Sequence, residues 1–141
     1  MSGTGVARTP RWAARRAGRR TAFAVALAVQ LVLLYWPRGV QPAGDLPWDK
    51  VVHALVFGLV MWTGVRAGVP ARPWLAVSLA HAALSEALQG ALLPDRSGDP
   101  WDAVADAAGV LVAAALLARS VTRSSPSGLR TPADGVTRAR E

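Results

Sequence analysis

A small set of polar residues lies inside or beside long apolar stretches of the chain, where charge is costly. Its members are Asp49, Lys50, His53, Glu86, Gln89, Asp102 and Asp106. One histidine with several carboxylates supplies the groups for general acid–base catalysis, and carboxylates also suit a hard divalent cation. His53, Glu86, Asp102 and Asp106 are the catalytic candidates, although no serine or cysteine nucleophile is expected beside them, since Ser85 lies on another helical stripe than Glu86. We assign no cofactor and no resident metal.

The elements that carry these residues follow from composition. The 141 residues allow one domain, 52% of them are apolar, and cysteine is absent, which excludes disulfides and thiol chemistry. The net charge of +7 would suit nucleic-acid binding, but six arginines precede the first apolar run and five follow the last one. Basic clusters that flank apolar runs are typical of membrane proteins, so we expect membrane lipids and no nucleic acid as partners.

Four apolar runs predict an all-α, four-helix transmembrane bundle. They cover about residues 21–36, 51–69, 74–93 and 101–118 and are joined by short loops rich in Pro, Gly and Asp. The membrane domain is therefore predicted over residues 21–118, between disordered tails at 1–20 and 119–141. Four tryptophans near the ends of the runs are predicted to anchor them at the membrane interface: Trp36, Trp48, Trp74 and Trp101.

The distribution of basic residues predicts that both termini are cytoplasmic. With the N-terminus inside, 13 of the 16 Lys and Arg residues fall on the cytoplasmic side, and only Arg38, Lys50 and Arg96 fall on the other. The expected location is the plasma membrane. A cleaved signal peptide is an alternative interpretation of the first run, but its basic segment is long and no small-residue cleavage site follows Trp36.

Helical spacing indicates that the polar residues converge near the extracytoplasmic end of the bundle. Asp49 and His53 are four residues apart, as are Asp102 and Asp106, while Glu86 and Gln89 are three apart. Ionisable groups within a bilayer cost roughly 2.5–3.5 kcal/mol each at its centre and normally face partners. Simpler structural roles remain open for several of these residues. His53 and His81 could each form a hydrogen bond to a neighbouring helix, and Asp102 could be an acidic residue favoured at a helix N-terminus. Asp49 and Lys50 could be ordinary charges at the membrane interface.

The same residues resemble the VanZ-like family of small bacterial membrane proteins. The resemblance rests on Asp49-Lys50-Val51-Val52-His53 as D-K-x-x-H, on Glu86-Ala87-Leu88-Gln89 as E-x-x-Q, and on Arg96 six residues before Asp102. It ends with Asp102, Asp106 and Gly109, where the family shows D-x-x-x-N-x-x-G, so that Asp106 replaces an asparagine. The similarity covers about residues 31–117 and extends the expected ligand-binding set by Arg96.

This resemblance implies an envelope protein connected with tolerance of the glycopeptide teicoplanin, without specifying a reaction. The first hypothesis is therefore a protein that binds or remodels an envelope component at its outer face. Lys50 and Arg96 would there hold a phosphate or carboxylate of a lipid-linked or cell-wall component. The alternatives are an intramembrane acid–base or metal-assisted enzyme acting on a lipid-linked substrate, and a non-catalytic scaffold whose polar residues only specify helix packing.

Overall fold

The computed structural model describes residues 10–35, 47–92 and 99–122. Within these ranges the chain is helical except for Pro10, Asp99 and the short turn after Ala67. The helices are α1 (Arg11–Tyr35), α2 (Pro47–Ala67), α3 (Ala71–Leu92) and α4 (Pro100–Thr122). Each is long and apolar enough to cross a membrane. The predicted all-α, four-helix transmembrane architecture is confirmed.

The helices at both ends are longer than predicted. α1 begins at Arg11, so residues 11–20, which were expected in a disordered tail, are helical. The carbonyl oxygen of Pro10 accepts the amides of Ala13 and Ala14, and the Arg- and Ala-rich stretch after it has high helix propensity. α4 likewise continues past residue 118 to Thr122. The remaining parts of the predicted tails, residues 1–9 and 123–141, lie outside the described residues.

The connection between α2 and α3 is a tight turn that makes the two helices antiparallel. Gly68 has a φ of +104°, a left-handed conformation that a residue without a Cβ adopts readily. The amide of Gly68 donates to the Val65 carbonyl and that of Val69 to the Gly64 carbonyl, each at 3.0 Å. This is the hydrogen-bond pattern of a Schellman C-cap, and it ends α2 at a defined point.

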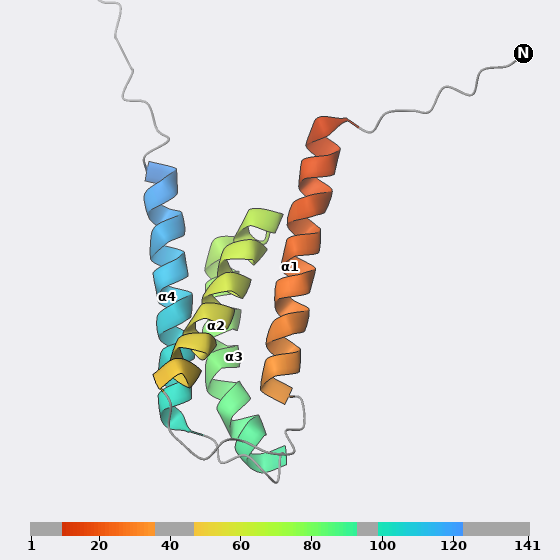
Figure 1. The fold of residues 1–141 in the computed structure, drawn as a ribbon. Helices are drawn as coiled ribbons and strands as arrows, with labels where there is room; N and C mark the ends of the chain where they lie inside the picture. Colours follow the sequence, from red (N-terminus) through yellow and green to blue (C-terminus); the bar gives the residue numbers. More distant parts are fainter. Residues whose placement is uncertain (1–9, 36–46, 93–98, 123–141) are drawn as a thin grey trace, which may run out of the picture.

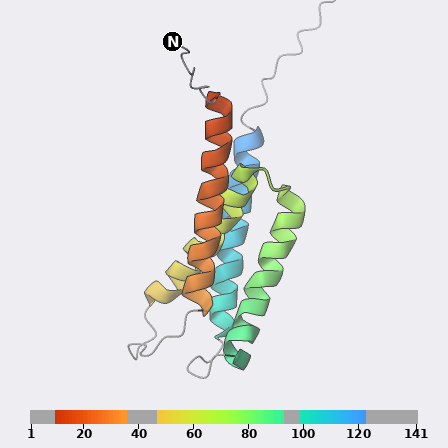
Figure 2. The same ribbon diagram turned by 90° about the vertical axis from the view of Figure 1, so that its right-hand side faces the viewer.

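Figures 1 and 2 show the resulting arrangement. The beginning of α1, the α2–α3 turn and the end of α4 lie at one end of the bundle, and the opposite end gathers the end of α1, the start of α2, the end of α3 and the start of α4. α2 packs most extensively against α4, whereas α1 and α3 contact each other little. The end at which α2 and α4 begin carries the polar residues discussed below.

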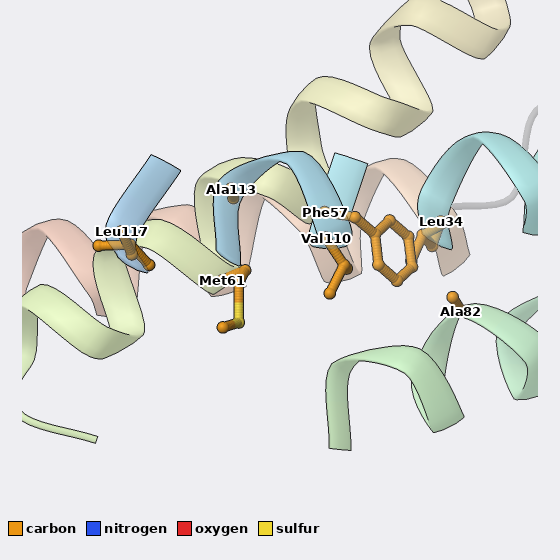
Figure 3. Packing of buried hydrophobic residues seen from close by; sticks show 7 residues of the cluster. All are labelled: Leu34, Phe57, Met61, Ala82, Val110, Ala113 and Leu117. Carbon is orange, nitrogen blue, oxygen red and sulfur yellow. The ribbon is translucent and has the colours of Figure 1, made fainter. Parts of the chain in front are cut away.

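The bundle interior contains a small apolar core. Figure 3 shows its members, Leu34, Phe57, Met61, Ala82, Val110, Ala113 and Leu117. Many large apolar side chains instead point outward, among them Val25, Leu55 and Leu84, which are more than half exposed. In water such a surface would drive association, but in a bilayer it contacts acyl chains of the same polarity.

Candidate functional site

A group of polar side chains from α2, α3 and α4 meets at the end of the bundle where α2 and α4 begin. We call it the polar cluster; it consists of Lys50, His53, Glu86, Gln89, Asp99, Asp102 and Asp106. Its outer part is an ion-pair network in which Lys50 Nζ lies 2.8 Å from Asp99 Oδ2 and 3.2 Å from Asp102 Oδ1. The Lys50 ammonium therefore already has two carboxylate partners, and an anionic ligand would have to displace them.

Asp99 belongs to this network, although it was not among the predicted site residues. Its Oδ1 accepts the backbone N–H of Trp101 at 2.9 Å, so it caps α4, whose first residue is Pro100. The pKa of the Asp99 carboxyl is lowered below its ordinary value, mainly by the hydrogen bond from the Lys50 ammonium and secondly by the one from the Trp101 N–H. The Asp-Pro pair before an apolar run is a sequence signal for such a cap and would have located it.

Glu86 connects the outer part of the cluster to its interior. The side chain is buried in α3, and its Oε2 accepts the backbone N–H of Asp99 at 3.1 Å. Its Oε1 lies 3.4 Å from Nε2 of Gln89, one turn further along the same helix. Both carboxylate oxygens are thus oriented by donors, one from its own helix and one from the residue that caps α4.

The innermost part of the cluster is a pair between His53 and Asp106. His53 Nδ1 lies 3.0 Å from Asp106 Oδ1, and the Asp106 side chain is 0% exposed. An ionised carboxylate only accepts, so in that state the imidazole Nδ1–H is the donor. The other oxygen of Asp106, Oδ2, is buried and has no hydrogen-bond partner among the described residues. Ligand atoms of His53, Glu86 and Asp106 all lie within 4.8 Å of one another.

Two glycines explain how His53 and Asp106 come so close. A Cβ built on Gly109 would collide with the carbonyl oxygen of Ala54, and one on Gly58 would lie 2.9 Å from the carbonyl oxygen of Gly109. α2 and α4 therefore touch backbone to backbone, close to the pair itself on both helices. Gly109, the last residue of the quoted motif, has a direct packing reason to lack a side chain.

Predicted site residues from α2, α3 and α4 lie together in the structure. Their helical spacing predicted this convergence. Asp49 is exposed at the rim, and its carboxylate lies within 4.8 Å of ligand atoms of His53 and Asp102. Arg96 lies outside the described residues. His81 lies outside the polar cluster and makes the predicted interhelical hydrogen bond, with its Nε2 3.3 Å from the hydroxyl oxygen of Tyr35. The centroid of its ring is 5.3 Å from that of Phe57.

One polar feature was missed by sequence reasoning. Gln30 and Ser78 line a cavity of about 230 Å³ between α1, α2 and α3. Both side chains are buried, and the amide of Gln30 and the hydroxyl of Ser78 have no hydrogen-bond partners among the described residues. The available signal was Gln30 itself, since it is the only polar side chain between Phe23 and Leu34.

Comparison with known proteins identifies no relative of this chain. No family model, curated protein or solved structure matches it significantly. Within the described residues the polar cluster offers many hydrogen-bond acceptors, one ion-paired ammonium and one imidazole held by a carboxylate. Such a set can accept hydrogen bonds from a polar group, transfer a proton at His53, or bind a cation.

Proposed function

We propose that this chain is an integral membrane protein of the cell envelope that binds the polar head group of an amphipathic envelope component at its polar cluster. One observation carries the proposal: polar groups of three helices converge at one end of a bundle whose sides are apolar. A ligand with an acyl or prenyl chain can then lie along the bundle with its head group at this end. The resemblance to the VanZ-like family adds the expectation that this binding affects tolerance of teicoplanin-type glycopeptides.

The charges of the cluster indicate the chemistry of the head group. Its carboxylates are those of Glu86, Asp99, Asp102 and Asp106, against the single ammonium of Lys50, which is already paired. The described side chains therefore favour a head group rich in hydroxyl, amide or ammonium donors. The proposed role of Lys50 therefore differs from the one first expected, which was to hold a phosphate. A phosphate without other head-group atoms would be repelled by the carboxylates that surround Lys50.

The proposal includes an orientation, with both termini in the cytoplasm and the polar cluster facing outward. Because the chain has no cysteine, single cysteines can report it without background. Trp48→Cys, at the exposed start of α2, is expected to react with a membrane-impermeant maleimide in intact cells. Ala71→Cys, at the exposed start of α3, should react only after the cells are opened. The reverse labelling pattern would place the cluster in the cytoplasm and contradict an outward-facing site.

Binding to two lipids that share a prenyl chain tests the head-group preference. The detergent-purified full chain is expected to retain a lipid-linked saccharide–peptide precursor in native mass spectrometry and to retain the corresponding prenyl phosphate at least about tenfold less, a difference of about 1.4 kcal/mol. Glu86→Gln should reduce retention of the precursor because the head group loses a charged acceptor. Tyr35→Phe is the matched control, since it removes an interhelical hydrogen bond outside the cluster.

Equal retention of both lipids would show that the phosphate alone is recognised and would contradict the proposed head-group chemistry. Equal retention of the precursor by wild type and Glu86→Gln would show that the lipid does not bind at the polar cluster. Reduced folded yield of the cluster variants with no change in lipid retention would favour the scaffold interpretation.

A second candidate function is favoured by the His53–Asp106 pair. A histidine oriented by a buried carboxylate is the arrangement that general-base catalysis uses, and here it lies beside a second carboxylate, Glu86. The chemistry would be proton transfer on the head group of the bound lipid. Turnover of the precursor by wild type, lost in His53→Gln with binding retained, would establish this function.

A further inference from the structure

The inner part of the polar cluster places two carboxylates and one imidazole in a space suited to an ion. Ligand atoms of His53, Glu86 and Asp106 lie within 4.8 Å of one another, at the ends of side chains from three different helices. Glu86 and Asp106 are both buried, and His53 is only partly accessible. The separation between His53 Nδ1 and Asp106 Oδ1 is 3.0 Å, close to the ~3.3 Å between neighbouring ligands of a tetrahedral Zn²⁺ ion.

A second observation concerns an unsatisfied polar atom of the same three residues. Oδ2 of Asp106 is buried without any hydrogen-bond partner among the described residues, although a buried carboxylate oxygen is normally satisfied. Two adjacent carboxylates in a membrane interior also repel each other, and both lose their hydration. One divalent cation would neutralise the two negative charges and would supply a partner for the Asp106 oxygen.

We propose that His53, Glu86 and Asp106 together bind one divalent transition-metal cation, of which Zn²⁺ is the best-fitting representative. One nitrogen and two oxygen ligands from the protein suit Zn²⁺, which then keeps a further coordination position for water or a ligand. The imidazole argues against Mg²⁺ and Ca²⁺, which prefer oxygen ligands throughout. On binding, the cation takes the place of the proton between His53 Nδ1 and Asp106 Oδ1. A neutral imidazole then carries its N–H at Nε2, whereas an imidazolium keeps that N–H and releases the Nδ1 proton to solvent.

The surroundings meet a further requirement of a metal site. Glu86 is oriented by the Gln89 side chain and by the Asp99 amide, and such outer hydrogen bonds hold ligands in place. A second acidic group lies beside the first: ligand atoms of Asp49, His53 and Asp102 are within 4.8 Å of one another. Asp49 is exposed at the rim, so this outer group adjoins the surface and shares His53 with the buried one.

The cation site goes beyond the proposed lipid binding and is tested without any lipid ligand. Untagged full-length protein in a non-ionic detergent is dialysed against buffered Zn²⁺, and bound metal is measured by mass spectrometry per chain. We expect one Zn²⁺ per chain. Glu86→Gln and Asp106→Asn should each weaken binding at least about tenfold, and Gln89→Ala about tenfold. Tyr35→Phe should bind as wild type does, because its hydrogen bond lies outside the cluster.

Two further measurements keep the outcome independent of misfolding and of adventitious binding. X-ray absorption of the wild-type complex should show nitrogen and oxygen ligands at about 2.0–2.2 Å, including one imidazole. Circular dichroism of each variant establishes that the helices are retained. Sub-stoichiometric Zn²⁺, or a spectrum without imidazole, would overturn the proposal. Loss of binding in Asp49→Asn but not in Glu86→Gln would also overturn it, because the ion would then occupy the outer group.

If the wild type binds Zn²⁺ as described but no lipid, the cation site stands and the lipid-binding proposal fails. If the protein takes up no Zn²⁺ and still binds the lipid after all metal has been removed, the lipid-binding proposal stands and the cation site fails.

Discussion

Gly109→Ala is expected to destabilise the bundle by about 2–3 kcal/mol, at the upper end of the usual cost of overpacking. The added methyl group would collide with the Ala54 carbonyl oxygen, which is backbone and cannot rotate away. α2 and α4 must therefore move apart, and the nearby His53–Asp106 hydrogen bond lengthens with them. The free energy of unfolding can be followed by titration with SDS in mixed micelles, using the fluorescence of the six tryptophans.

The chain supplies matched controls for this substitution. Gly18 lies in α1, and a Cβ added there would meet no atom within 4 Å, so Gly18→Ala should be neutral or stabilising by up to ~1 kcal/mol through helix propensity. Gly58→Ala should fall between the two, because its Cβ would lie 2.9 Å from the Gly109 carbonyl oxygen. If Gly109→Ala were as stable as Gly18→Ala, the close approach of α2 and α4 would be wrong.

Asp106→Ala is expected to cost about 1–2 kcal/mol of stability and to abolish the proposed binding of Zn²⁺. The carboxylate is 0% exposed and is the hydrogen-bond partner of His53, which α2 presents to α4. In water, breaking a buried pair typically costs about 3–5 kcal/mol. Interhelical hydrogen bonds in membranes are worth less, about 0.6 kcal/mol on average and ~1.7 at most, because the unfolded helices also find partners in the bilayer. We therefore expect a loss of stability near the membrane values and below the range typical of buried pairs in water.

Asp106→Asn separates the stability effect from the effect of charge. Asparagine retains an oxygen that can accept the Nδ1–H of His53. Its unfolding free energy should stay within about 0.5 kcal/mol of wild type. In a double-mutant cycle, Asp106→Ala and His53→Ala should be coupled by roughly 1 kcal/mol. Additive effects would show that the two side chains contribute independently.

The spacing of residues predicted the helices and their polar faces because both depend on short-range periodicity. Asp49 and His53, or Asp102 and Asp106, share a stripe in any α-helix, whatever its neighbours. The partners across helices could not be predicted in the same way, because they depend on how each helix is rotated in the bundle. Lys50 was expected to be available for a phosphate, and only the positions of Asp99 and Asp102 in space show that it is paired.

Trp74 illustrates the same limit. Its place at the start of an apolar run predicted an interface anchor, and tryptophan is common there. In the structure its ring packs edge-on against Phe23, with centroids 5.4 Å apart, and its Nε1 donates to the Val60 carbonyl at 3.3 Å. The residue type was compatible with both roles. Interface anchoring stays a prediction, whereas these two partners depend on the positions of α1 and α2 beside the start of α3.

The connection of α2 and α3 to α4 through the polar cluster has a consequence for biogenesis. The chain is synthesised from its N-terminus, so α4 is the last of the four helices to reach the membrane. Until then His53 lacks Asp106, and Glu86 lacks the amide of Asp99. The three-helix intermediate therefore exposes polar groups that bilayer lipid cannot satisfy, and the translocation machinery or water must shield them. Arrival of α4 supplies both partners and completes the polar cluster.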